Sequence, residues 1–139
     1  SLMGYGDWVN EHPGTTVLAP DPRYQDLYKK NFGNYFGSDV LRFPVTPLPP
    51  DPDLPKKTPV IVVRAGDGSQ AFTYDAIAGR VDADSVWSTE IGGVPVRFRY
   101  YAHPPAVITA SNDSSKPLEV IYAFWFAWYA LHPDTELAR

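Results

Sequence analysis

Hydrophobic and polar residues alternate most regularly near the middle of the chain, in the run VPVRFRYYA (94–102). One side of an extended chain would carry Val94, Val96, Phe98 and Tyr100. Arg97 and Arg99 fall on the other side, which is the period of a half-buried strand. The run SVWSTEI precedes this segment, and Gly92-Gly93 lies between the two. The pattern predicts a β-hairpin with a glycine turn.

Similar patterns predict strands on both sides of this hairpin. PVIVVRA (59–65) and QAFTY (70–74) read as another hairpin, with Asp67-Gly68 supplying the positive φ angles of its turn. Two more strands are predicted at Ala106–Ser111 and Leu118–Phe124, separated by the polar turn NDSSKP. Asp75–Gly79 reads as a helical turn closed by its glycine.

Three segments are predicted to be helical. Asp7 is the expected N-cap of a short helix that ends at His12, because the residue before a proline is disfavoured in the α region. One or two helical turns are expected from Arg23 to Lys30. In FWFAWYALHPDT the helical spacing of Phe124, Trp128 and Leu131 predicts a third helix.

The remaining segments are predicted to be mostly irregular. Thr15–Ala19 reads as a brief strand and Gly33–Asp39 as an aromatic loop punctuated by Gly33 and Gly37. Seven prolines between Pro44 and Pro59 exclude helix and interior strand, so this connection is expected to lie extended across the body of the domain. The predicted class is α+β: a mainly antiparallel sheet of five or six strands, a few short helices and a long proline-rich connection.

The composition of the chain excludes several classes of function without identifying one. The 139 residues carry a net charge of −4, which argues against a nucleic-acid partner. The most apolar stretch, Val120–Leu131, is too short for a membrane span and is expected in the core. Without cysteine, the chain has no disulfide, thiolate metal site or cysteine nucleophile. The opening Ser-Leu resembles an expression remnant, so residues 1–139 are expected to be a single domain excised from a larger protein.

One phrase occurs twice. WVNEHPGT begins at Trp8 and WYALHPDT begins at Trp128, and every shared residue recurs 120 positions later. In each copy we expect tryptophan to anchor a short helix, His-Pro to end it and threonine to hold the turn. The structural residues of this device are Trp8, Pro13 and Thr15 in the first copy and Trp128, Pro133 and Thr135 in the second. The offset also suggests a duplication of which the chain spans slightly more than one unit.

Several motifs resemble those of one prokaryotic family, domain of unknown function 3179. DGSQAFTY and the hairpin around Gly92-Gly93 are similar to that family's "gGearAYPl" and "vNDtvgGxPvxVtY" segments, and both HPxT phrases resemble its "W…HPdTxVL" segments. Many members carry a Cys-x-x-Cys pair after the second hairpin, where this chain has YYAHPPA (100–106). The resemblance therefore implies a copy without thiol-based metal or redox chemistry. It also implies an extracytoplasmic location, periplasm or cell envelope.

Two groups of residues are candidate sites. His103 replaces the cysteine pair and could form an anion- or sugar-binding face with Tyr101, Arg99, Arg97 and Trp87. The plainer interpretation makes the arginines the solvated side of a sheet. His12 and His132 could bind a metal if the chain ends meet, with oxygen ligands from Glu11, Asp134 or Glu136, although zinc normally requires three or four protein ligands.

The leading hypothesis is a non-catalytic binding or structural module of a larger prokaryotic protein, with other domains of that protein as partners and no cofactor. One alternative is a metal-binding protein or enzyme that uses His12, His103 and His132. Another is a homo-oligomerisation unit in which the aromatic helix Phe124 to Leu131 packs against its own copy.

Overall fold

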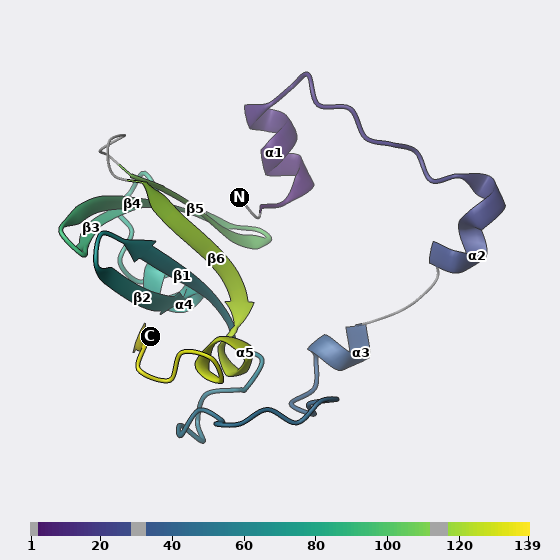
Figure 1. The fold of residues 1–139 in the computed structure, drawn as a ribbon. Coiled ribbons are helices and arrows are strands. Elements are labelled where there is room, and N and C mark those ends of the chain that lie inside the picture. The colour runs from purple at the N-terminus through teal and green to yellow at the C-terminus, as the bar shows by residue number, and fades with distance from the viewer. Residues whose placement is uncertain (1–2, 29–32, 112–116) are drawn as a thin grey trace.

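Four strands form the first of two sheets in the computed structural model, which describes residues 3–28, 33–111 and 117–139. Their order is β6-β1-β2-β7, where β1 is Pro59–Ala65, β2 is Gly68–Thr73, β6 is Leu118–Phe124 and β7 is Glu136–Ala138. β1 pairs antiparallel with both β2 and β6, and the short β7 pairs parallel with β2 (Figure 1).

The second sheet is an antiparallel meander in the order β3-β4-β5. Its strands are β3 (Val86–Ile91), β4 (Val94–Ala102) and β5 (Pro105–Ser111). The helix α4 (Tyr74–Ala78) connects the two sheets, with the Thr73 hydroxyl accepting from the Ala76 N–H at its start and Gly79 as its C-cap. The predicted α+β class is confirmed. The described strands divide between two sheets, however, and they number seven. The strand that was not predicted is β7, because three residues are too few to show a periodicity.

β1 is buried on both faces because the first sheet is covered on both sides. Ile61 and Val63 face the second sheet and pack in one apolar cluster with Phe72 and Phe98. Val60 and Val62 point to the opposite face, into a second cluster with Trp125 and Trp128 of helix α5 (Trp125–Tyr129). The successive side chains of a strand point to opposite faces, so the continuous apolar run of β1 fills two separate cores.

The two hairpin turns lie against each other. Gly92 and Gly93 have φ angles of 54° and 70°, as predicted for a glycine turn, and a Cβ added to Gly92 would lie 2.0 Å from the Ala65 carbonyl oxygen. In the first hairpin the positive φ of 56° belongs to Gly66 rather than to Asp67-Gly68. The two loop residues there are 66 and 67, since Ala65 pairs with Gly68, and only the first is left-handed, as in type II′ turns.

The N-terminal residues form an arm that loops away from the sheets (Figure 1). It contains α1 (Tyr5–Glu11), a 3₁₀ turn (Pro22–Tyr24), α2 (Gln25–Tyr28) and α3 (Gly33–Phe36). The first helix ends before His12 as predicted, but its N-cap is Gly4, and Asp7 lies in its first turn. Thr15–Ala19 forms no strand, because no described strand lies beside it to pair with it.

Other arm predictions are partly confirmed. The helix expected to reach Lys30 is seen as far as Tyr28, and its last two predicted residues lie outside the described ranges, as does most of the predicted NDSSKP turn. The expected loop Gly33–Asp39 begins instead as α3. Residues 44–58 contain no helix or strand, and Figure 1 shows this connection running past α5, beyond the end of the sheets.

Candidate functional site

The outer face of the second sheet carries most of the predicted binding residues. Arg97, Arg99 and Tyr101 alternate with the buried Val96 and Phe98 along β4, so all three side chains lie on the face away from the core. Strand pairing places Ile108 and Val86 beside Arg99. A hollow of about 200 Å³ on this face is lined by Glu11, Val86, Arg97, Arg99, Ile108 and Ala110. The face therefore combines two cations and a phenol on a partly apolar floor.

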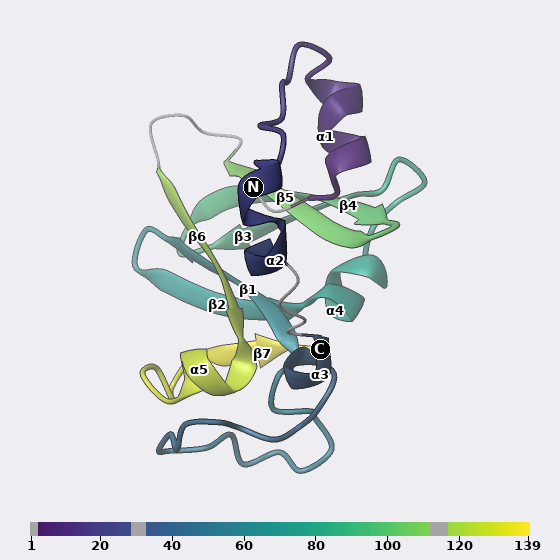
Figure 2. The ribbon, with the colours of Figure 1, turned by 90° about the vertical axis from the view of Figure 1, so that its right-hand side faces the viewer.

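A carboxylate from the arm already occupies this face. Oε1 of Glu11, at the last residue of α1, accepts a short hydrogen bond from the Tyr101 hydroxyl and lies 3.6 Å from Nη1 of Arg99. Gly4, before the first turn of α1, lies against Pro104 in the β4–β5 turn, and Figure 2 shows α1 above this hairpin. The helix α1 thus reaches from the β4–β5 turn to the outer face of β4, where its Glu11 carboxylate contacts Tyr101 and Arg99.

The Tyr101 hydroxyl donates to the Glu11 carboxylate, and its surroundings shift its pKa. Partial burial raises the pKa of Tyr101, and the hydrogen bond to Glu11 raises it further, while Arg99 opposes the shift. A tyrosine hydroxyl is protonated at neutral pH even at its ordinary pKa of about 10, and the upward shift leaves this donor proton in place. Arg99 and Glu11 remain partly exposed, so this ion pair adds about 0–1 kcal/mol to stability and serves mainly to orient the carboxylate.

Two residues predicted to belong to the binding face, Trp87 and His103, lie apart from it. Trp87 stands opposite Phe98 in the strand register and therefore points to the core, where its ring stacks on Phe98 at 5.1 Å. His103 is exposed in the β4–β5 turn, on a cis peptide bond to Pro104. The structure thus joins Arg97, Arg99 and Tyr101 with Glu11. Sequence reasoning had assigned Glu11 only to a metal, because a contact across 90 positions leaves no local pattern.

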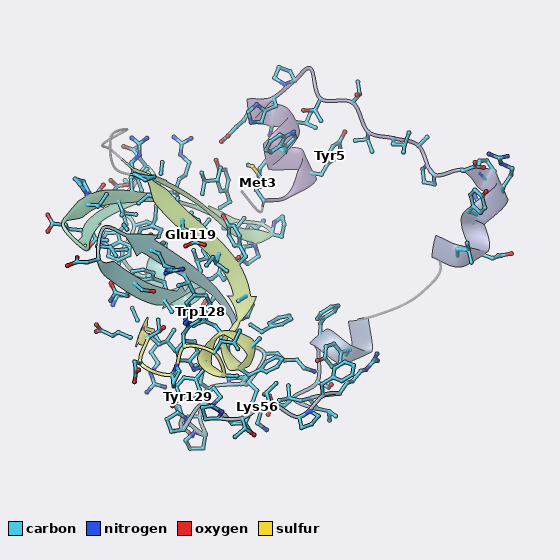
Figure 3. The ribbon with its side chains drawn as sticks, in the orientation of Figure 1. Met3, Tyr5, Lys56, Glu119, Trp128 and Tyr129 are labelled. Carbon is cyan, nitrogen blue, oxygen red and sulfur yellow. The ribbon has the colours of Figure 1, made fainter. Side chains whose placement is uncertain are left out.

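The structure does not bring His12 and His132 together. Each ring packs on the tryptophan of its own phrase, His12 on Trp8 at 4.2 Å and His132 on Trp128 at 4.1 Å. Figure 3 shows the labelled Tyr5 of α1 and Trp128 of α5 well apart, one above and the other below the sheets in this view. Among the described residues no group of three or more histidine, cysteine or acidic side chains is placed to hold a metal ion.

The two HPxT phrases fold into the same device. In each, the indole Nε1 donates to the threonine hydroxyl, at 2.8 Å from Trp8 to Thr15 and 2.9 Å from Trp128 to Thr135. The histidine N–H donates to the tryptophan carbonyl and the threonine N–H to the histidine carbonyl in both copies. In the first copy α1 ends at the His-Pro step, because proline disfavours the α region for the residue before it, whereas in the second copy α5 already ends at Tyr129.

The two copies differ in burial, and this difference predicts how much a substitution in each copy lowers the stability of the protein. Trp128 is 8% exposed and Trp8 is 37% exposed. We expect Thr135→Val to cost about 1–3 kcal/mol of unfolding free energy, because it leaves a buried indole N–H without an acceptor. The matched Thr15→Val should cost less than about 0.5 kcal/mol, since water can reach that indole. Urea unfolding followed by circular dichroism would measure both; equal losses would contradict the assignment.

Lys57 is a buried cation that sequence reasoning missed. Its Nζ donates to the carbonyl oxygens of Tyr35, Ser38 and Val40 at 2.5–2.6 Å, and it lies 3.6 Å from the centre of the Tyr35 ring. Burial lowers the pKa of Lys57, Asp39 opposes this shift and Arg42 adds to it. An ammonium has three protons, and all three are used here, so Lys57 ties residues 35–40 to the start of β1.

The fold and site define the class: an α+β protein of two small sheets, in which Tyr101 and Arg99 of one strand face contact the Glu11 carboxylate, with no ligand cluster for a metal in its described part. No described helix combines the length and the apolar character that a membrane crossing requires. The family model described as protein of unknown function (DUF3179) matches residues 1–116, and the chain belongs to this family, as its motifs predicted. No curated protein and no solved structure matches the chain.

Proposed function

We propose that this chain is a non-catalytic binding module whose β4 face, formed by Arg97, Arg99 and Tyr101, binds a carboxylate group of its partner. The observation that carries the proposal is the capture of the Glu11 carboxylate by Tyr101 and Arg99. A cation and a neutral donor that converge on one oxygen form a charge-assisted site, and such hydrogen bonds are stronger than neutral ones. The module serves a larger prokaryotic protein whose other domains are its partners, outside the cytoplasm.

The exposure of the side chains on the β4 face supports reversible binding rather than catalysis. The Arg99 and Glu11 side chains are partly solvated, so this face lacks the water-excluded surroundings in which electrostatic catalysis is strong. Each histidine is exposed, and His12 and His132 pack against tryptophan rings. In this proposal Glu11 is a built-in occupant, so a partner carboxylate competes with it.

The test is a thermal-shift titration with succinate and with an oligoglutamate peptide. The Glu11→Ala chain, whose face is vacated, should be stabilised by about 3–6 °C at roughly ten times the ligand's Kd. The unaltered chain should respond less, because Glu11 competes. The double variant Glu11→Ala/Arg99→Ala should not respond, and the matched control Glu11→Ala/Arg64→Ala should respond fully, since Arg64 pairs with Glu119 on the other sheet.

Succinate and the oligoglutamate peptide distinguish two possible sources of the bound carboxylate, a small dicarboxylate and an acidic protein segment. A response by the Arg99→Ala double variant equal to that of Glu11→Ala would show that binding occurs elsewhere. The absence of any response from Glu11→Ala to either ligand would overturn the proposal.

A further inference from the structure

The two copies of the HPxT device lead into different structures. After Thr135 the chain continues as β7, which extends the first sheet by pairing parallel with β2. In that register Glu136 is opposite Gln70 and Leu137 is opposite Ala71. The C-terminal device therefore delivers an edge strand to the sheet, and its tryptophan fills the core beneath that sheet.

The N-terminal device has the same internal bonds but no sheet of its own. By the offset of 120 positions, Thr16, Val17 and Leu18 correspond to the residues of β7. These three residues pair with no described strand, and Val17 is 64% and Leu18 95% exposed. Adjacent exposed apolar residues in a segment able to form a strand indicate a surface that another strand covers.

We propose that the N-terminal device caps the sheet of a second unit of this fold, with Thr16–Leu18 added in parallel to that unit's β2 strand as β7 is added here. The occupant of the device is thus a β2 edge, because the segment after the C-terminal copy pairs with β2. Strand addition supplies main-chain hydrogen bonds, and Trp8 and Val17 supply apolar contacts. The spacing of 120 residues between the devices then equals one unit of a tandem array, in which one device ends a unit and leads into the next.

This inference does not depend on the carboxylate face, since it concerns residues 16–18 and the opposite sheet. In the chain of residues 1–139 the β2 edge is already covered by β7. A chain that ends at Thr135 leaves that edge open while keeping the C-terminal device itself. Such a chain should accept the N-terminal device of another copy.

Disulfide trapping tests this pairing directly, because the chain contains no cysteine of its own. A full chain with Thr16→Cys is mixed with a chain that ends at Thr135 and carries Gln70→Cys. Paired strands lie about 4.8 Å apart, within the ~4.4–6.8 Å between Cα atoms that a disulfide spans. Under mild oxidation the mixed dimer should form in several-fold excess over that obtained with the control Gln25→Cys, whose thiol lies on α2 of the same arm.

The proposal requires that Val17→Asp, added to the Thr16→Cys chain, reduce the yield to that of the control. Equal yields from Thr16→Cys and Gln25→Cys would overturn the proposal, provided that circular dichroism shows the shortened chain to be folded. A yield that Val17→Asp leaves unchanged would overturn it as well.

A second variant keeps the test decisive if the shortened chain does not fold. In the full chain the β7 residues are replaced by their counterparts, as Glu136→Thr, Leu137→Val and Ala138→Leu. If the N-terminal segment fits a β2 edge, the melting temperature should stay within about 4 °C of the original, whereas Leu137→Asp alone should lower it by more. A transplanted chain that melts as early as the Leu137→Asp chain would overturn the proposal.

Discussion

Phe98→Ala is expected to destabilise the protein by about 3–5 kcal/mol, the range for truncating a buried aromatic side chain. The Phe98 ring is fully buried and lies 5.1 Å from Phe72 and 5.1 Å from Trp87. Phe72 belongs to the first sheet and the other two to the second, so the substitution opens a cavity where the sheets meet. Urea unfolding should show a lower midpoint with an unchanged slope, because the surface exposed on unfolding hardly changes.

Phe43→Ala is the matched control for this prediction. It makes the same chemical change at a ring that is 76% exposed on the arm. We expect its unfolding free energy to change by less than about 0.5 kcal/mol. Similar losses from Phe98→Ala and Phe43→Ala would mean that the two sheets do not share a core around Phe98.

The residues of the hairpins could be predicted because their signals are local. In β4 the alternation of Val94, Val96 and Phe98 with arginine fixes the face that each residue takes, and this face is the one observed. The turn at Gly92-Gly93 reflects the need for positive φ at both positions. The switch from β6 to α5 at Trp125 could not be placed, because a buried strand and a buried helix are both continuously apolar.

The site was predicted less completely than the fold, and for a physical reason. Strand periodicity put Arg97, Arg99 and Tyr101 on one face, but it equally puts Trp87 on the core side, opposite Phe98. The Glu11 contact and the three carbonyls around Lys57 join segments far apart in the chain. Such contacts depend on how the arm packs, which no local spacing encodes.

The repeated device shows how the same residues differ in energetic weight when their surroundings differ. The internal hydrogen bonds of the two copies agree to within 0.2 Å or better, as in the His N–H to Trp carbonyl distances of 2.8 and 3.0 Å. Only the C-terminal copy lies on a sheet, where Trp128 packs with Val60 and Val62. Local sequence therefore specifies the form of the device, while its contribution to stability depends on the surface that it covers.

Trp128→Ala should accordingly cost about 3–5 kcal/mol, since it removes a buried indole from the second apolar cluster and frees the Thr135 hydroxyl that holds the turn before β7. Trp8→Ala makes the same change in the exposed copy and should cost about 1 kcal/mol or less in the isolated chain, where one hydrogen bond and few apolar contacts are lost. Circular dichroism is the suitable measurement, because each variant also loses a fluorophore. Equal losses in a monomeric chain would contradict this difference between the two devices. A Trp8→Ala loss that grows with protein concentration would instead indicate that the N-terminal device is buried against a second copy, since association stabilises a folded chain by mass action.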